Sequence, residues 1–403
     1  IFTSILLKRL NTWAEQHSII PEEQAGFRPG RGCQDNLFTL SAIISIKLLN
    51  NSSLFGIFVD LKAAFDSVSH SLLYEKLLKL GVGSKITNIT KSLYDNATIR
   101  VLTENGFTDD IQISAGILQG EPLSPFLFNL FISDLTRFFK EKGVTTIKLA
   151  NYKKLSLLCY ADDIVILATS IIDVKEKLLI LEEYCRLNSL KINTSKTKII
   201  HFSKSTRPRK FIQVCVNNIP LSIVNTHSYL GVPFSLTGKF FQASKYFISK
   251  GKIATNQVRQ ILINSKANSI KPIRKLLDAV VKSSLLYACE IWAYRYADDL
   301  EAVQLQFLKQ IFNLPKSTPN SYLRLECAIF PVKLTIVKSM LSFLLKLLEM
   351  PNNRLPRICF DTLLSLDSLS YNNSYNWVSQ LKSELISIGH LDTFLTLNPL
   401  TIR

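Results

Sequence analysis

Several features are scarce in this sequence of 403 residues. Its seven cysteines stand singly without a Cys-x-x-Cys pair, and its five histidines form no pair at metal-ligand spacing. These spacings argue against a zinc knuckle and a disulfide framework, so we expect reduced packing cysteines in an intracellular protein of the nucleus and cytoplasm. The longest apolar stretch, Ile336–Met350, contains Lys338 and Lys346. It is too interrupted for a membrane span, and we expect no membrane partner.

Acidic residues are few relative to basic ones. The 48 Lys and Arg exceed the 31 Asp and Glu, which gives a formal net charge of +17. Between Lys239 and Lys282 there are ten basic residues and one acidic residue, Asp278. Such a segment is typical of a surface that binds a polyanion, most simply nucleic acid. The alternative is a basic surface that only keeps the protein soluble.

Composition and length indicate a globular protein. The hydrophobic fraction is 47% and the charged fraction 20%, and a chain of this length can form two or three domains with a large core. The chain opens on Ile1 rather than Met, so we expect it to be a fragment of a longer protein.

Two adjacent carboxylates stand between two short apolar runs. Leu155–Cys159 and Ile164–Ala168 flank Asp162 and Asp163, and the second run is β-branched, which is typical of a buried strand. Four residues separate the runs, which is a hairpin-turn length. Like charges this close repel unless a cation lies between them, so the pattern favours a divalent metal ion. A solvated turn is the alternative.

A third carboxylate, Asp60, stands near the end of the apolar run Leu54–Leu61, for which we predict a strand. A carboxylate at the end of a buried strand is costly without a metal or a partner. Adjacent antiparallel strands would bring Asp60 beside Asp162 and Asp163. We expect Asp66, six residues further on, to cap the following turn; a metal-ligand role is its alternative.

Two loops contain glycine together with polar residues. The sequence GFRPGRG spans residues 26–32; its backbone can approach a ligand closely, and Arg28 could reach a phosphate. A basic turn without a ligand is the alternative. Gln119 and Gly120 lie in the second loop, where the amide could meet a base or sugar edge, or could stabilise the turn. With the carboxylates and the basic segment, these loops fit two-metal phosphoryl transfer to a nucleic-acid end.

The tetrapeptide Tyr-Ala-Asp-Asp occurs a second time, as Tyr296–Asp299. Apolar residues follow it at helical spacing, Leu300, Val303 and Phe307 among them, and no β-branched run follows. Acidic residues in the first turn of a helix favour its dipole. We therefore predict a helix start at the second copy, with no metal role.

Six motifs, in order, resemble the reverse transcriptase of non-LTR (LINE-type) retrotransposons. They are GFRPGRG, FVDLKAAFD, GILQGEPLSPFLFN, YADD, LKINTSKTK and YLGVP, and LLYACEIW and LPKSTPN resemble the segment that follows the palm. The resemblance covers roughly residues 1–330. It implies an α+β fold: a right-hand polymerase with an antiparallel palm sheet and a mainly helical C-terminal part. The implied boundaries are fingers 1–55 and 83–120, palm 56–82 and 121–235, a helical thumb 236–315, and a helical extension 316–403 of unknown role.

The resemblance also implies an activity, RNA-directed DNA polymerisation with two Mg²⁺ ions or with Mn²⁺. The metals would be held by Asp60, Asp162 and Asp163, with the backbone carbonyl of Leu61. Phe65 matches the bulky residue that excludes a ribose 2′-hydroxyl, so that DNA is made.

Further roles follow from the same motifs. Lys196 matches the lysine that protonates the leaving pyrophosphate, and the expected partners are an RNA or DNA template, a DNA primer and dNTPs. The remaining implied site residues are Arg28, Gln119 and Gly120 for nucleotide binding and Leu230 and Gly231 for the primer grip. On the thumb we add the duplex-binding residues Lys245, Lys252 and Arg259.

The chain departs from a complete element. It contains no recognisable endonuclease domain, ribonuclease H carboxylate set or Cys/His knuckle, so we expect target cutting outside this chain. Two alternatives stay open. One is a catalytically inactive, retrotransposon-derived fragment that binds nucleic acid. The other is a domesticated or telomerase-like polymerase, which the likeness after the palm disfavours.

Overall fold

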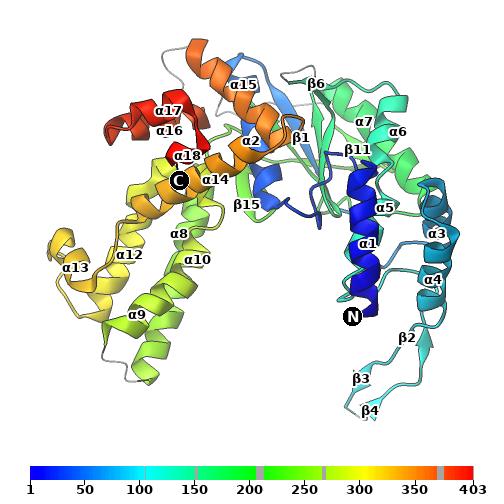
Figure 1. Cartoon of the computed structure of the whole chain (residues 1–403), viewed down its shortest axis with the longest axis horizontal. Helices are drawn as coiled ribbons and strands as arrows, with labels where there is room; N and C mark the ends of the chain where they lie inside the picture. Colours follow the sequence, from blue (N-terminus) through cyan, green and yellow to red (C-terminus); the bar gives the residue numbers. More distant parts are fainter. Residues whose placement is uncertain (105, 150–152, 206–212, 266–268, 370–375, 403) are drawn as a thin grey trace. The chain divides into compact units, whose positions relative to one another are not determined.

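The computed structural model describes residues 1–104, 106–149, 153–205, 213–265, 269–369 and 376–402 (Figure 1). The chain divides into two units. The first consists of Ile1–Asn36, Leu54–His201 and Arg207–Val224, and the second of Leu37–Ser53, Phe202–Thr206 and Asn225–Arg403. The predicted boundary at residue 235 lies inside the second unit, and this unit also contains both the predicted thumb and the predicted extension.

A five-stranded sheet forms the centre of the first unit. Its strand order is β13-β10-β1-β9-β8, and β1 is buried along its whole length. β1 pairs antiparallel with β9, and β9 pairs antiparallel with β8, whereas β10 and β13 run parallel. The predicted strands at both aspartate motifs are thus confirmed. The strand bounds are β1 Leu54–Val59, β8 Leu157–Tyr160, β9 Asp163–Ala168, β10 Lys198–Phe202 and β13 Ser222–Ile223.

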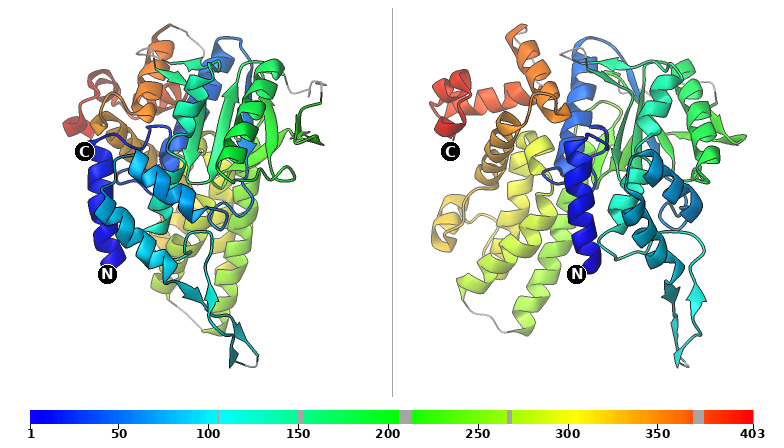
Figure 2. Two further views of the ribbon diagram at one scale, coloured as in Figure 1. Left: turned by 90° about the vertical axis from the view of Figure 1, so that its right-hand side faces the viewer. Right: turned by 45° about the vertical axis from the view of Figure 1, so that its right-hand side comes forward.

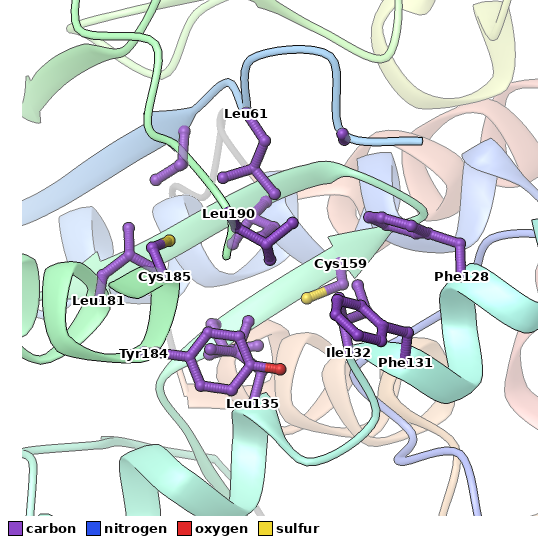
Figure 3. Packing of buried hydrophobic residues seen from close by; sticks show 14 of the residues in the cluster. Leu61, Phe128, Phe131, Ile132, Leu135, Cys159, Leu181, Tyr184, Cys185 and Leu190 are labelled. Carbon is purple, nitrogen blue, oxygen red and sulfur yellow. The ribbon is translucent and has the colours of Figure 1, made fainter. Parts of the chain in front are cut away.

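Helices α5 (Ser124–Phe131), α6 (Leu135–Glu141) and α7 (Ile171–Leu187) bury the sheet's apolar side chains. Every residue of α5 except the half-buried Pro125 is buried, as expected for a helix that is apolar on nearly every face. Figure 3 shows Cys159 of β8 beside Phe131, with Tyr184 of α7 on the other side. Each large apolar side chain buried in this way contributes about 1.5–3 kcal/mol.

The N-terminal helix α1 (Phe2–Gln16) is amphipathic, as expected. Leu6 and Leu10 are buried, and Trp13 packs partly against the core. Ile5 was expected on the same face but is exposed, because successive residues of a helix differ by about 100° and Leu6 already faces the core.

Helices α3 (His70–Lys79) and α4 (Ser84–Asp95) precede a narrow β-ribbon that projects from the first unit (Figures 1 and 2). The ribbon consists of two short pairs: β2 (Thr98–Ile99) with β5 (Ile111–Gln112), and β3 (Leu102–Thr103) with β4 (Gly106–Phe107). The hairpin was expected with strands 99–103 and 110–114. Its returning strand instead begins at Gly106 and is interrupted near Asp109 and Asp110. The latter pairs with Arg100 across the ribbon.

Two further short pairs complete the first unit. They are β6 (Ile147–Lys148) with β7 (Lys154–Leu155), and β11 (Cys215–Val216) with β12 (Ile219–Pro220). A strand was expected around 212–216; its last two residues form β11, and Ile212 lies outside the described residues.

The second unit is mainly helical. It contains most of α2 (Cys33–Leu49) and the hairpin of β14 (Thr226–Tyr229) and β15 (Val232–Ser235). The helices expected after Phe240 are confirmed. They are α8 Phe241–Asn264, α9 Ile270–Leu276, the π-helix η2 Leu277–Lys282, α10 Ser283–Leu285, α11 Cys289–Trp292, the 3-10 helix η3 Tyr294–Tyr296, α12 Ala297–Ile311, α13 Asn320–Cys327, α14 Val332–Glu349, α15 Leu355–Leu369, α16 Trp377–Ser387, α17 Leu391–Thr396 and α18 Pro399–Ile402.

Two expectations from composition can be compared with the structure. Within the described ranges no single helix is long and apolar enough to cross a membrane; α13 and α14 reach that length and apolarity only together, across a bend of 66°. The cysteines expected to pack in the core mostly do so. Cys33 is half-buried and Cys215 is exposed, while the buried ones are Cys159, Cys185, Cys289, Cys327 and Cys359.

Candidate active site

Three aspartates lie at one end of the antiparallel strands β1, β9 and β8. Val59, the last residue of β1, pairs with Ile164, so Asp60 follows at the level of Asp163. Asp163 begins β9 and pairs with Tyr160 of β8. The sheet register therefore brings together carboxylates that are far apart in the sequence.

The backbone around Asp60 is held by the segment before β10. The Asp60 N–H donates to Oγ1 of Thr197 (3.2 Å), and the Asp60 carbonyl accepts from the Asn193 N–H (2.8 Å). Leu61 faces Ile192 in an antiparallel bridge whose hydrogen bonds come from the flanking residues. The Leu61 carbonyl therefore points away from Ile192, as its predicted role as a metal ligand requires.

The turn between β8 and β9 consists of only two residues, Ala161 and Asp162. The predicted hairpin is confirmed, and it is tighter than expected because Tyr160 and Asp163 already belong to the strands. Ala161 has φ +53°, a left-handed conformation that costs a non-glycine residue roughly 1–2 kcal/mol. The surroundings must hold this strained turn in place.

The pKa values of the Asp162 and Asp163 carboxyls are raised. Burial raises the pKa of the Asp162 carboxyl, and the charge of Asp60 raises it further, while a backbone hydrogen bond acts in the opposite direction. For Asp163, burial comes first, followed by the charges of Asp162 and Asp60, and together they raise the pKa to about 6. Ionised carboxylates this close to each other favour a bound cation.

This donor set fits a hard divalent cation in its chemistry. It consists of carboxylate oxygens and one backbone carbonyl, which are the ligands that Mg²⁺ prefers, and burial together with neighbouring carboxylate charge raises the pKa values of Asp162 and Asp163. Across the described ranges, however, no three His, Cys, Asp or Glu side chains are already arranged to hold an ion.

The loop with Gln119 and Gly120 is attached to the segment after β1. The Ile117 N–H donates to the Phe65 carbonyl (2.9 Å), and Gln119 Nε2 donates to Oδ1 of Asp66 (3.1 Å). Gln119 and Gly120 are both exposed. We expected Asp66 to cap the following turn. Instead its exposed carboxylate accepts from Gln119, because this side chain faces the loop.

The ring of Phe65 has a defined position beside this loop. It is half-buried and stacks on Phe128 of α5, with ring centroids 4.7 Å apart and planes inclined by 19°. Its expected role against a ribose 2′-hydroxyl stays a prediction, but a fixed ring of this kind can exclude a substituent by its bulk.

Arg28 does not face an open surface. It is 6% exposed, and its guanidinium donates to both carboxylate oxygens of Glu15 (2.7 and 2.9 Å) and to the carbonyls of Pro21 (2.8 Å) and Gln24 (3.1 Å). These bonds join the GFRPGRG loop to α1. Because its donors are directed at protein groups, the structure gives no support to the predicted contact with a triphosphate.

Lys196 lies in the segment that holds Asp60. It directly precedes Thr197, whose hydroxyl accepts from Asp60. Lys196 is exposed, and among the described residues its ammonium group forms no ion pair. Its role in protonating a leaving group stays a prediction.

Leu230 and Gly231 form the two-residue turn of the β14–β15 hairpin in the second unit. Both have positive φ, +46° and +80°, which suits a tight hairpin turn. Tyr287 supports the turn: its hydroxyl donates to the Leu230 carbonyl (3.2 Å), and a Cβ at Gly231 would lie 3.3 Å from its ring. The primer-grip role of this turn stays a prediction.

The predicted duplex-binding residues lie on α8. Lys245, Lys252 and Arg259 are all exposed, and the Lys245 ammonium lies 4.3 Å from the ring centroid of Phe241. Lys266, another residue of the basic segment, lies outside the described residues. An exposed row of cations on one long helix is compatible with phosphate binding.

The second Tyr-Ala-Asp-Asp copy begins a helix, as predicted. Asp298 and Asp299 lie in the first turn of α12. Apolar residues of α12 then face the core at helical spacing; they include Leu300, Val303 and Phe307.

Sequence reasoning missed two residues at these sites, Gln24 and Tyr287. Gln24 is buried and its side chain contacts Ala161, 137 residues away. A weak signal existed for each of them, since Gln24 directly precedes the sequence AGFRPGRG and Tyr287 lies within LLYACEIW. Neither sequence reveals the partner.

Residues 1–234 match the family described as reverse transcriptase (RNA-dependent DNA polymerase). The match covers more than half of the chain, and the chain therefore belongs to the reverse transcriptase family. Enzymes of this family generally depend on divalent metal ions, which agrees with the aspartate cluster.

Curated relatives come from non-LTR elements. The chain is 30% identical over 246 residues to a retrovirus-related Pol polyprotein from the type-1 retrotransposable element R2 of Popillia japonica (58% of this chain, 33% of that protein). It is 24% identical over 311 residues to the probable RNA-directed DNA polymerase from transposon BS of Drosophila melanogaster (76% and 34%). For the RNA-directed DNA polymerase from mobile element jockey of Drosophila funebris, the identity is 25% over 321 residues (77% and 34%).

These similarities identify a non-LTR reverse transcriptase, as the sequence motifs implied. The chain spans about a third of the length of each of these relatives.

Solved telomerase structures also share similarity with the chain. Telomerase from Candida albicans, in complex with a fragment of telomeric RNA, has a TM-score of 0.43 and 11% identity over 89% of this chain and 58% of that chain. Apo telomerase from Candida tropicalis has a TM-score of 0.42 and 14% identity over 89% and 60%. Similarity at this level carries no argument about activity.

Proposed function

We propose that this chain adds dNTPs to the 3′-hydroxyl of a DNA primer on an RNA or DNA template, as the polymerase part of a larger non-LTR retrotransposon protein. The observation that carries the proposal is the meeting of Asp60, Asp162 and Asp163 at one end of β1, β9 and β8, where burial and the neighbouring carboxylates raise the pKa values of Asp162 and Asp163. Endonuclease activity would lie outside this chain.

In this proposal Asp60, Asp162 and Asp163 hold two Mg²⁺ ions, which Mn²⁺ can replace, with help from the Leu61 carbonyl. When bound, the cations would lower the pKa of the primer hydroxyl and stabilise charge on the pyrophosphate. The protein residues orient these groups: the bonds from Asn193 and Thr197 fix the backbone of Asp60.

Other residues act on the nucleotide. The Phe65 ring excludes a 2′-hydroxyl, Gln119 and Gly120 line the nucleotide's path, and Lys196 gives a proton from Nζ to the leaving pyrophosphate. In the second unit, Leu230 and Gly231 contact the primer end, and the basic residues of α8 bind the phosphates of the duplex.

The direct test is primer extension on poly(rA)/oligo(dT) with Mg²⁺. We expect extension that EDTA abolishes and that Mg²⁺ or Mn²⁺ restores. Duplex binding without extension, under either metal, would contradict the proposal and favour the inactive nucleic-acid-binding fragment.

Sugar discrimination tests the nucleotide site separately. Phe65→Ala should raise the ratio of rNTP to dNTP incorporation by about 10- to 100-fold, the range that loss of a steric contact produces. Because Phe65 also stacks on Phe128, Phe65→Leu serves as a control that keeps bulk at this position. If the ratio stays unchanged in Phe65→Ala, Phe65 does not contact the sugar.

A further inference from the structure

We propose that Gln24 and Gly26 are positioning residues for the catalytic aspartates, because they hold the turn that carries Asp162. The inference rests on the proposed function for the role of Asp162. It gives the GFRPGRG loop a purpose other than ligand binding.

Both backbone polar groups of Ala161 are held by partners inside the protein. This residue is 4% exposed, so its N–H and carbonyl need partners inside the protein. The amide of Gln24 supplies both: Oε1 accepts from the Ala161 N–H (2.9 Å), and Nε2 donates to the Ala161 carbonyl (3.2 Å). A single buried side chain thus satisfies both polar groups of the strained turn residue.

The same amide joins the turn to the glycine loop. Oε1 of Gln24 also accepts from the Gly26 N–H (2.9 Å). At Gly26 a Cβ would lie 2.4 Å from the Ala161 nitrogen, a distance that no real side chain tolerates. Glycine is therefore required here by the close approach of two backbones. The Gly26 carbonyl in turn accepts from Nδ2 of Asn129 on α5 (2.6 Å).

Backbone pairing fixes this segment beside β8. The Cys159 N–H donates to the Glu23 carbonyl (2.8 Å), and the Ala25 N–H donates to the Cys159 carbonyl (3.0 Å). Gln24 and Cys159 form a parallel bridge. Residues 23–26 thus extend the sheet by a short segment along the strand that leads into the catalytic turn.

Two facts favour positioning over a purely structural role. Ala161 is in a disfavoured left-handed conformation, so the turn needs outside support to keep one geometry. The supported turn places Asp162 and Asp163, and a catalytic carboxylate displaced by as little as about 0.5 Å loses productive geometry. Arg28 belongs to the same assembly, since its guanidinium donates to the Gln24 carbonyl.

The test compares Gln24→Met, which keeps length but loses both hydrogen-bonding groups, with Asn376→Leu as a matched control. Asn376 is also a fully buried amide that bonds backbone in both directions: it accepts from the Val378 N–H (2.9 Å) and donates to the Leu363 carbonyl (2.7 Å). Within the described part of the chain, both of these hydrogen bonds lie away from residues 160–163. Both variants are made in the full chain, and both should lower thermal stability.

Three readouts separate the variants: hydrogen exchange of the peptide that contains Ala161, Mn²⁺ affinity with template–primer bound, and the Mg²⁺ concentration for half-maximal extension. Gln24→Met should speed hydrogen exchange. It should also lower the Mn²⁺ affinity and raise the Mg²⁺ concentration for half-maximal extension, each by about 10- to 100-fold, as loss of a group that orients a metal ligand does. The KM for template–primer should change less than about twofold, since no phosphate contact is altered. Asn376→Leu should leave all of these unchanged.

Faster exchange in Gln24→Met with unchanged metal affinity would overturn the proposal, because Gln24 would then only stabilise the fold. Equal metal effects in Asn376→Leu would overturn it as well, since general destabilisation would explain them. A wild-type chain that neither extends a primer nor binds Mn²⁺ would refute the proposed function, and the inference would fail with it. If the wild-type chain extends a primer and Gln24→Met has the wild-type Mn²⁺ affinity and Mg²⁺ dependence, the inference alone is refuted.

Discussion

The tetrapeptide Tyr-Ala-Asp-Asp folds in two different ways within this chain. At Tyr160–Asp163 it closes the β8–β9 hairpin, with Ala161 at φ +53°. At Tyr296–Asp299 it ends η3 and begins α12, with Ala297 at φ −59° and ψ −39°. The four residues alone do not choose between these conformations.

The surroundings of each copy explain the difference. A β-branched run that pairs with β1 follows the first copy, whereas apolar residues at helical spacing follow the second. In the hairpin, burial and neighbouring carboxylates raise the pKa of Asp163 to about 6. At the helix start, Asp298 and Asp299 interact favourably with the helix dipole. The same charge pair is costly in one place and stabilising in the other.

The largest expected contrast is catalytic. Asp162→Asn should lower primer extension by at least about 10²–10³-fold, because removing one group that stabilises transition-state charge has effects of this size. Template–primer affinity should stay within a few-fold. Asp298→Asn should leave extension nearly intact. A dead Asp298→Asn enzyme beside an active Asp162→Asn enzyme would reverse the two assignments.

The second contrast concerns nucleic-acid affinity, which we assign to the unit that contains the second copy. Changing Lys245, Lys252 and Arg259 together to Ala should flatten the log–log salt dependence of duplex binding by roughly two to three units, at about 0.9 per phosphate contact. Extension at saturating template should change little. An unchanged salt slope in the triple variant would mean that these three side chains of α8 face solvent and do not bind the duplex.

The third contrast concerns folding stability without divalent metal. Two Asp→Asn variants should change the free energy of unfolding in opposite directions. Asp163 binds its proton more tightly in the folded state (pKa about 6) than its ordinary value of 3.8. The stabilising contribution of the Asp163 carboxyl to the free energy of unfolding is therefore fully present below about pH 4, and it is lost as the pH rises to about 6. Asp163→Asn should remove this loss and raise the free energy of unfolding at pH 7.5 by about 1 kcal/mol, after allowance for solvent screening.

The matched variant Asp298→Asn should instead lower the free energy of unfolding by about 0.3–1 kcal/mol, because it removes a favourable interaction with the helix dipole. Chemical denaturation in EDTA between pH 4 and 8 measures both effects. If Asp163→Asn and Asp298→Asn change the free energy of unfolding in the same direction at pH 7.5, the electrostatic difference between the copies is contradicted.

The smallest contrast is at the alanines. Ala161→Gly should be neutral or should stabilise by up to about 1 kcal/mol, since glycine adopts positive φ without strain. Ala297→Gly should destabilise by up to about 1 kcal/mol, as glycine does in a helix. Urea denaturation shows whether each variant raises or lowers the free energy of unfolding. A clear loss of stability in Ala161→Gly would mean that the buried methyl group matters more than the strain.

Local sequence patterns predicted the elements that carry the aspartates. The apolar runs before Asp60 and around Asp162 are strands, and the apolar segment after Pro122 is the buried helix α5. These patterns succeed because burial of short apolar runs is a local property of the sequence. The ribbon at 98–112 was less predictable, since its exposed residues have no buried face to fix the register.

Contacts between distant segments could not be read from the sequence. Arg28 was expected to face a phosphate, but it is buried and a partly exposed ion pair with Glu15 holds it. The partner of Gln24 lies 137 residues away in a turn, and no spacing rule connects the two. Side-chain hydrogen bonds of this kind depend on the finished fold, whereas periodicity reports only which face is buried.

We propose above that the first Tyr-Ala-Asp-Asp copy, with Asp60, holds the catalytic cations. Iron(II) in place of magnesium tests it most directly: with ascorbate and peroxide, it cleaves the backbone near its binding site, and mass spectrometry identifies the cut positions in the wild-type chain. We predict cuts near residue 60 and near residues 162–163, suppressed by excess Mg²⁺, and none near 298–299. Mg²⁺-sensitive cuts near 298–299 without cuts at the other two positions would show that the second copy, and not the first, holds the cations.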